Sequence, residues 1–149
     1  MENQPHTHIN PTRIMGVDLG RARIGIALSD LSGILASPFT TISHNDDSDV
    51  AITAIVKVAE TEQVSEIVVG IPYSLSKENS SARDDAMEFI AGLGKHTSIK
   101  ITGYDERFTT VLASKKLRET GHDSRTMKSK IDAMAATEIL QQFLDNRGI

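Results

Sequence analysis

The sequence predicts an α/β domain built on a five-stranded mixed sheet. Three apolar segments joined by short connections fill residues 13–42, and helical and strand patterns alternate after residue 47. Short connections favour antiparallel strands, whereas strand-helix-strand alternation favours parallel strands with helices on the faces of the sheet. We therefore expect an antiparallel three-stranded meander extended by two parallel strands. The 149-residue chain suits one such domain at residues 13–149, preceded by a flexible arm at residues 1–12.

The first two strands form a hairpin. Apolar, β-rich runs occupy residues 13–19 and 24–29, and Gly20 between them can adopt a positive φ in the turn. Residues 34–42 are the third strand. Pro38 within it predicts an edge strand or a bulge, because proline donates no backbone hydrogen bond.

Helices and buried strands follow in alternation. A helix begins at Ser48 or Asp49 as N-cap and ends near Gln63, with apolar residues at helical spacing. The later elements are expected in the following ranges: a strand at 66–71, a helix at about 82–94, a strand at 99–104, a helix at about 109–119 and a last helix at about 127–146.

Composition excludes several classes of protein. The chain has no cysteine, so it has neither disulfides nor a thiolate zinc site, and it has no apolar run near the roughly 20 residues of a membrane helix. Its polar N-terminus is not a signal peptide. A net charge of −4 argues against a general nucleic-acid binder unless basic residues are clustered locally.

Asp18 is a carboxylate inside an apolar strand, where a charge is costly unless something compensates it. One interpretation is that Asp18 braces the adjacent turn, and another is that it belongs to a metal or phosphate site. Two further acidic residues, Asp105 and Glu106, stand at the end of the strand at 99–104. Alternation along that strand puts them on opposite faces, so only one of the two can face Asp18.

Asp132 is the fourth acid at an unexpected position. At about 100° per residue, it lies in the middle of the apolar stripe of Ala135, Ala136, Ile139 and Phe143. A favourable interaction with the helix dipole would not explain a charge on the buried face. Carboxylates that converge would repel one another unless a cation binds between them. An oxygen-only ligand set favours Mg²⁺ or Mn²⁺, which suits phosphoryl chemistry.

A basic span connects two of these acidic positions. Residues 107–130 contain seven basic and two acidic residues, which gives the span a net charge of +5. The simplest interpretation is a solvated helix face, but a track for a phosphate backbone is the alternative. The basic residues are Arg107, Lys115, Lys116, Arg118, Arg125, Lys128 and Lys130.

Four motifs in order resemble the YqgF/RuvX family of pre-16S rRNA nucleases, which are also similar to Holliday-junction resolvases. The motifs are MGVDLG at 15–20, GIP at 70–72, DERFTT at 105–110 and KIDAMAA at 130–136. The resemblance covers about residues 13–146. It implies a ribonuclease H-like fold and a cytoplasmic, metal-dependent nuclease that acts in maturation of the 16S rRNA 5′ end.

Carried over by position, the resemblance makes Asp18, Glu106 and Asp132 the catalytic, metal-binding acids, with Asp105 as the alternative to Glu106. Arg107 and Lys130 match positions suited to phosphate contact. With Lys115, Lys116, Arg118 and Lys128 they are the expected substrate-binding residues. The chain departs from the family at residues 73–80, which contain no glycine and so put backbone contacts of this loop to substrate in question.

Three other functions remain open from the sequence. A resolvase of branched DNA would use the same acids. An actin- or sugar-kinase-like nucleotide binder shares the VDLG hairpin, but such enzymes bind ATP between two domains of this fold, and 149 residues supply one. A non-catalytic RNA-binding module is the third alternative. The acids argue against it, because buried negative charge beside phosphate does not favour RNA binding. The sequence does not decide between a monomer and a homodimer.

Overall fold

The computed structural model describes residues 11–20, 22–43, 47–72, 80–106 and 125–147. The predicted helix at 109–119 and the glycine-free segment at 73–79 lie outside these residues. The elements are β1 (Arg13–Leu19), β2 (Arg23–Ser29), β3 (Ala36–Ser43), α1 (Ser48–Thr61), β4 (Val64–Ile71), α2 (Ser80–His96), β5 (Lys100–Asp105) and α4 (Arg125–Arg147).

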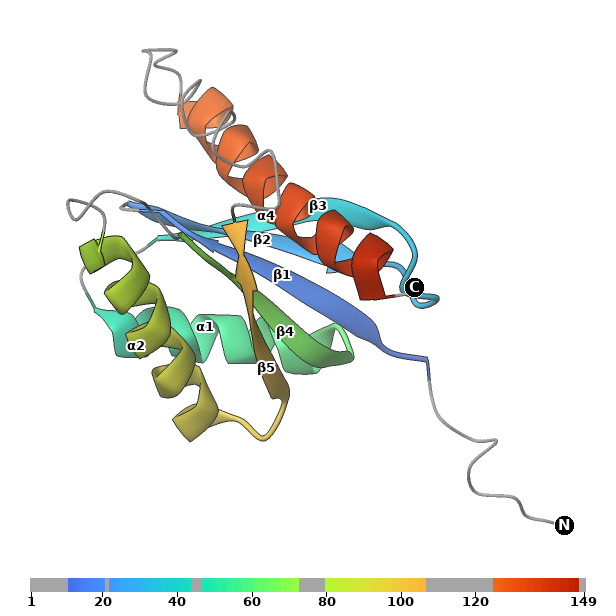
Figure 1. The fold of residues 1–149 in the computed structure, drawn as a ribbon, viewed down its shortest axis with the longest axis horizontal. Coiled ribbons are helices and arrows are strands. Elements are labelled where there is room, and N and C mark those ends of the chain that lie inside the picture. The colour runs from blue at the N-terminus through green and yellow to red at the C-terminus, as the bar shows by residue number, and fades with distance from the viewer. Residues whose placement is uncertain (1–10, 21, 44–46, 73–79, 107–124, 148–149) are drawn as a thin grey trace, which may run out of the picture.

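The sheet has the predicted mixed character. Its strand order is β3-β2-β1-β4-β5; β1 pairs antiparallel with β2, and β2 with β3. The β1–β4 and β4–β5 pairings are parallel. The central strand β1 therefore joins the meander to the parallel half, and the carboxyl ends of β1, β4 and β5 lie at one edge region of the sheet (Figure 1).

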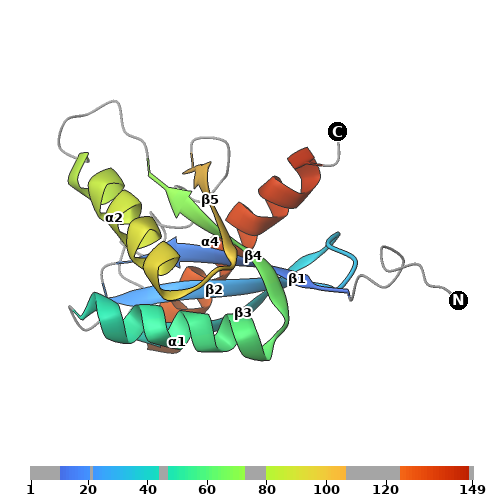
Figure 2. The ribbon, with the colours of Figure 1, turned by 90° about the horizontal axis from the view of Figure 1, so that it is seen from below.

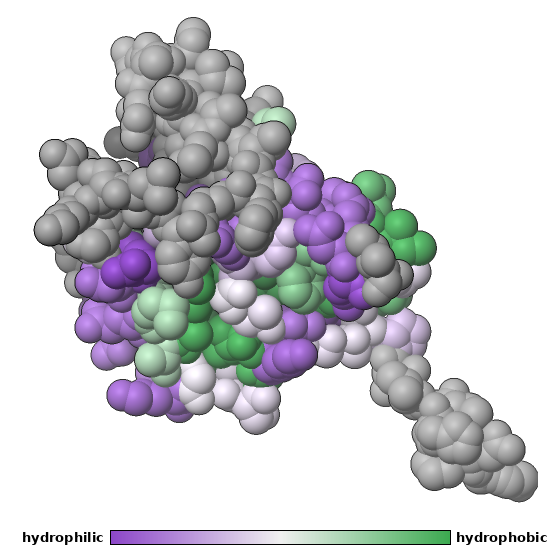
Figure 3. Space-filling view, in the orientation of Figure 1, coloured by the Kyte–Doolittle hydropathy of each residue, from purple (hydrophilic) through white to green (hydrophobic). Residues whose placement is uncertain are grey.

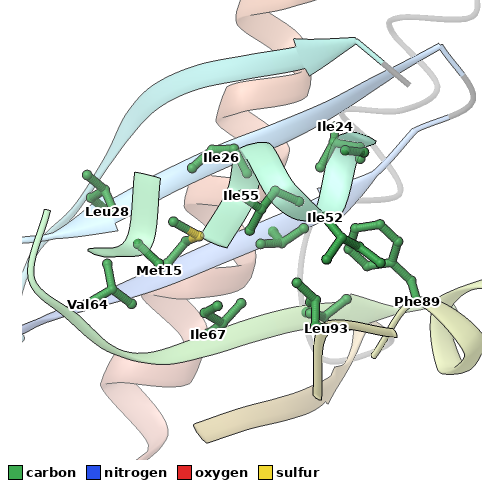
Figure 4. Packing of buried hydrophobic residues seen from close by; sticks show 14 residues of the cluster. Met15, Ile24, Ile26, Leu28, Ile52, Ile55, Val64, Ile67, Phe89 and Leu93 are labelled. Atoms are coloured by element: carbon green, nitrogen blue, oxygen red, sulfur yellow. The ribbon is translucent and has the colours of Figure 1, made fainter. Parts of the chain in front are cut away.

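Helices cover both faces of the sheet. Figures 1 and 2 show α1 and α2 on one face and α4 across the other. The α1 and α2 face holds the larger apolar cluster, with Met15, Ile26, Ile55, Ile67 and Leu93 at its centre (Figure 4). Burial of these large side chains is the main stabilising contribution of this layer.

The α4 face is built for close approach. Its buried cluster contains the small residues Ala27, Ala135 and Ala136. A Cβ atom at Gly16 would lie 2.7 Å from Leu140 Cβ and 2.8 Å from the Ala136 carbonyl oxygen. Since no side chain intervenes at Gly16, α4 packs directly on the backbone of β1.

Strand β3 confirms the prediction made from Pro38. It lies at the edge of the sheet, and its pairing with β2 shifts from Ile26↔Thr40 to Ala27↔Pro38. Phe39 is therefore an extra residue that has no partner in the ladder, as in a β-bulge. Both alternatives that proline suggested, an edge strand and a bulge, occur together.

Several helix boundaries differ from the prediction. The N-cap of α1 is Asp47, whose Oδ1 accepts hydrogen bonds from the N–H groups of Asp49, at 3.1 Å, and Val50, at 3.2 Å. The prediction of Ser48 or Asp49 was wrong because five consecutive residues that can cap a helix occur at 45–49, and the apolar pattern does not choose among them.

Helix α2 extends to His96 despite its two late glycines. A Cβ at Gly92 would lie 2.7 Å from Ile52 Cδ1, so this glycine lets α2 approach α1 rather than ending the helix. Among the described helices, none is long and apolar enough to cross a membrane.

Exposed apolar side chains gather at the turn between β2 and β3. Leu31, Ile34 and Leu35 are exposed there, and Figure 3 shows hydrophobic surface at this end of the molecule. Three hydrogen bonds tie the turn to α4: Ala36 N–H donates to Gln141 Oε1 at 2.9 Å, Gln141 Nε2 donates to the Ile34 carbonyl oxygen at 2.9 Å, and Arg147 Nη2 donates to the Gly33 carbonyl oxygen at 3.2 Å.

Candidate active site on the α4 face of the sheet

Asp18 lies in the central strand and points to the α4 face. Side chains alternate along a strand, and Gly16, two residues earlier, contacts α4. Asp18 is fully buried, with both carboxylate oxygens shielded from solvent. The carboxylate therefore sits under the helix, at the carboxyl end of β1, rather than at the exposed tip of the hairpin.

Two glycines flank Asp18 in the neighbouring strands. Gly25 of β2 is its direct cross-strand partner. Gly70 of β4 follows Val69, which pairs with Val17, so Gly70 lies beside Asp18 on the other side. Because glycine has no side chain, both positions leave space on the α4 face of the sheet. Asp132 occupies the space at Gly25, and Glu106 occupies the space at Gly70.

Asp132 enters the space above Gly25. A Cβ at Gly25 would lie 2.0 Å from the carbonyl oxygen of Asp132, so the helix backbone rests on this glycine. Asp132 is 3% exposed, as its angular position on the apolar stripe predicted. The helix begins at Arg125, two turns upstream, and the dipole effect is confined to the first turn. Stabilisation of the helix terminus therefore does not explain Asp132.

Glu106 enters the space above Gly70. A Cβ at Gly70 would lie 3.0 Å from Glu106 Oε2, and Glu106 is 2% exposed. Asp105 belongs to the other face. A Cβ at Gly103, two residues before it, would meet Ile71 and Ile90. Ile90 packs on the cluster of the α2 side, and Ile71 shares the face of Val69, which belongs to that cluster. The structure thus places Glu106, rather than Asp105, on the face of Asp18 and Asp132.

Arg23 is the residue of this site that the sequence analysis missed. Its Nε donates to Asp132 Oδ2 at 2.9 Å, and the two residues are 109 positions apart in the chain. The Arg23 side chain is 26% exposed, whereas that of Asp132 is 4% exposed. The only available sequence signal was a basic residue immediately before the apolar run of β2, which is also common in hairpin turns.

The donor set is suited to a hard divalent cation. Asp18, Glu106 and Asp132 offer only carboxylate oxygens in a buried setting, where clustered negative charge is costly without a cation. Within the described part of the chain, however, no three acidic or histidine side chains are already arranged as a metal-binding group. The chemistry of the residues fits Mg²⁺ or Mn²⁺.

The described residues do not test the predicted phosphate-binding side chains. Arg107, Lys115, Lys116 and Arg118 lie outside the described residues. Lys128 and Lys130 are in the first two turns of α4, upstream of Asp132, but only their backbone is described. Their contribution to substrate binding stays a prediction.

Comparison with known proteins places the chain in a family. Residues 12–146 match the family RuvX, described as Holliday junction resolvase. A relative from Mycobacteroides abscessus is 41% identical over 136 residues, which cover 91% of this chain and 82% of the relative. A Koribacter versatilis relative is 41% identical over 92% of this chain and 89% of its own length. Both carry the name "Putative pre-16S rRNA nuclease".

A solved structure supports the fold. T. thermophilus RuvC in complex with a Holliday junction substrate has a TM-score of 0.56 and 11% sequence identity, and the match covers 92% of this chain and 96% of that one. At this identity the likeness concerns the fold, which is ribonuclease H-like, as the sequence predicted. The fold and the named relatives together define a nuclease of the ribonuclease H-like class. Within that class, the chain belongs to the RuvX family.

Proposed function

We propose that this chain is a divalent-metal-dependent nuclease that trims the 5′ end of pre-16S rRNA. One observation carries the proposal: Asp18, Glu106 and Asp132 come from three elements, and all three are buried on the α4 face, where Glu106 lies over Gly70 and the Asp132 backbone lies over Gly25. The names of the curated relatives support the rRNA substrate, and that role would place the chain in the cytoplasm.

The proposed cation is Mg²⁺ or Mn²⁺. Carboxylate oxygens are the ligands these ions prefer, and the chain has no cysteine to favour a softer metal. When bound, such ions activate water and stabilise the leaving oxygen in phosphodiester hydrolysis. Asp18, Glu106 and Asp132 would hold them.

In this proposal the three acids are held by different elements of the fold. Asp18 is fixed in the central strand, between two paired strands, and gives the site a rigid reference point. Glu106 directly follows β5, at the end of a strand of the sheet, and Asp132 belongs to α4, which packs on the sheet. A site assembled on packed elements can keep the reacting phosphate in line with its nucleophile.

Basic residues would bind the substrate backbone. Arg107 directly follows Glu106, and Lys130 precedes Asp132 by two residues, so each basic residue lies within two positions of a proposed catalytic acid in the sequence. Lys115, Lys116, Arg118 and Lys128 would extend the contact along neighbouring phosphates. Such contacts position a nucleic acid without reading its bases.

Cleavage of branched DNA is the second candidate. The family description as Holliday junction resolvase favours it. The two candidates share the acids and the metal, and differ only in the nucleic acid that is held beside them.

A cleavage assay separates these functions. Purified protein is incubated with Mg²⁺ and one of three substrates: an RNA that spans the mature 16S 5′ end, a four-way DNA junction, or a short single strand. We expect cleavage of the RNA near its mature end, with loss in excess chelator. Preferential, symmetrical cutting of the junction would favour the resolvase function instead.

Two nearly isosteric variants serve as a matched pair in the same assay. Glu106→Gln should lower the cleavage rate by at least about 100-fold, since it removes a charge that binds the cation. Asp105→Asn, one residue earlier but on the opposite face, should retain most activity. An inactive Asp105→Asn with an active Glu106→Gln would reverse this assignment.

A further inference from the structure

We propose that Arg23 is a positioning residue that neutralises Asp132 in the metal-free protein and competes with the divalent cation for it. Metal loading then requires the Arg23–Asp132 ion pair to open, and the released guanidinium is available to a substrate phosphate. This inference rests on the proposed metal-dependent function and deepens it.

The hairpin turn places Arg23 next to Asp132. The Gly20 N–H donates to the Arg23 carbonyl oxygen at 2.9 Å, which closes the turn between β1 and β2. A Cβ at Gly20 would lie 3.7 Å from Asp132 Oδ1, while Arg23 Nε contacts Asp132 Oδ2 at 2.9 Å. The Asp132 carboxylate therefore lies over the turn, with one oxygen near Gly20 and the other held by Arg23.

The two partners are unequal in burial. The Asp132 side chain is 4% exposed and depends on nearby compensation of its charge, whereas Arg23 at 26% still reaches solvent. A change of partner is thus easier for the arginine than for the aspartate. A guanidinium has five N–H donors, and this contact uses one, so the group is chemically suited to a phosphate as well.

Competition follows from geometry and charge. A cation bound through Asp132 would lie roughly 2 Å from a carboxylate oxygen and so within a few ångströms of the guanidinium. Two positive groups that share one carboxylate repel each other. The arrangement of the site agrees with this competition, because Arg23 already holds Asp132, one of the three candidate ligands, at 2.9 Å.

Binding of Mg²⁺ to full-length variants tests the inference without relying on activity. Arg23→Gln removes the charge and keeps a hydrogen-bonding side chain of similar reach. Arg13→Gln is the matched control, because Arg13 lies at the other end of β1, where its guanidinium donates to the Ser29 carbonyl oxygen at 3.2 Å. Calorimetry and the Mg²⁺-dependent shift in melting temperature each give an apparent Kd.

Arg23→Gln should melt below the wild type in chelator, yet bind Mg²⁺ at least about threefold more tightly, because the fraction of protein competent to bind no longer depends on opening the ion pair. Arg13→Gln should bind Mg²⁺ as the wild type does. In an Asp132→Asn background, Arg23→Gln should no longer change the affinity, since the residue through which it acts is altered.

Unchanged or weaker Mg²⁺ binding by Arg23→Gln would overturn the competition. If that variant does not fold, Arg23→Lys decides, because lysine forms a weaker pair here: tighter binding than wild type supports the inference, and equal or weaker binding refutes it. Failure of the proposed function looks different, since the wild type itself would then bind no Mg²⁺.

Discussion

Gly25→Ala is a one-carbon perturbation aimed at the contact between the sheet and the candidate active site. The new Cβ would lie 2.0 Å from the carbonyl oxygen of Asp132, 2.5 Å from its carbonyl carbon and 3.2 Å from the Ala133 nitrogen. All three are backbone atoms, so no rotamer change relieves the overlap. The helix must move away from β2 by about 1.5 Å to restore ordinary contact distances.

The expected cost follows from this overlap. Extra methyl groups in packed interiors destabilise by about 1–3 kcal/mol, and a contact between two backbones belongs at the upper end of that range. The same displacement moves Asp132 relative to Asp18. A misplacement of about 1 Å can lower a catalytic rate by about 100-fold. Gly25→Ala should therefore lose about 2–3 kcal/mol of stability and about two orders of magnitude in cleavage.

Two glycine variants control for general effects. Gly16→Ala also brings a Cβ closer than 3.0 Å to α4, at 2.7 Å from Leu140 Cβ, but it lies farther along the helix from Asp132. It should lose similar stability and less activity. Gly94→Ala in α2 meets nothing within 4 Å and should gain about 0.5–1 kcal/mol.

Urea unfolding measures the stabilities, and cleavage of the precursor RNA measures the activity, below the temperature at which any variant unfolds. The reasoning is refuted if Gly25→Ala unfolds within about 0.5 kcal/mol of the wild type and cleaves at the wild-type rate. It is also refuted if Gly16→Ala loses as much activity as Gly25→Ala at equal stability.

Three further predictions concern the cation, the basic span and an acid-sensitive turn. Cleavage should require Mg²⁺ or Mn²⁺ and be poorly supported by Ca²⁺, whose looser coordination suits in-line displacement badly; full activity in excess chelator would contradict this. Replacing Lys115, Lys116 and Arg118 by alanine should weaken RNA binding and reduce its salt dependence, as measured by titration at several salt concentrations; an unchanged slope would make these residues a solvated face. The backbone hydrogen bond from Ile34, with others in the turn, lowers the pKa of Asp30. Its stabilising effect is therefore present above the ordinary pKa of an aspartate and lost as pH falls through the lowered value, so Asp30→Ala should flatten the acid side of the melting-temperature profile.

Local pattern accounts for much of the fold and for the position of Asp132. Strand and helix alternation predicted the mixed sheet, and helical periodicity placed Asp132 on the buried face before any contact was known. Both features depend on the period of the apolar residues, which is a property of each segment alone. The bulge at Phe39 was also predicted, because Pro38 removes a backbone hydrogen-bond donor from its own strand.

Local patterns did not predict the contacts between segments that are distant in the sequence. Alternation showed that Asp105 and Glu106 face opposite ways, but which face meets Asp18 depends on how β5 pairs with β4. The ion pair between Arg23 and Asp132 joins residues 109 positions apart. The sequence analysis weighed a helix-dipole interaction of Asp132 against a cation site and offered no partner in the chain for its charge. In the fold the residue is braced by Arg23 and also lies on the face of the other acids.

The glycines within the strands were a sequence signal of close packing that the sequence analysis did not use. Gly25 and Gly70 interrupt apolar strands, where glycine is unfavourable unless another group approaches closely. Here the approaching groups are the backbone of Asp132 and the side chain of Glu106. The two positions therefore indicate where the acids enter, although a single sequence does not identify the group that approaches each glycine.

The location of a bound cation tests the central claim most directly. Crystals of the protein soaked in Mn²⁺ give an anomalous scattering peak at the metal position. The account predicts a peak on the α4 face, roughly 2 Å from carboxylate oxygens of Asp18 and Glu106. A peak beside Asp105 on the opposite face, or a Mn²⁺-saturated crystal with no peak near Asp18, would contradict it.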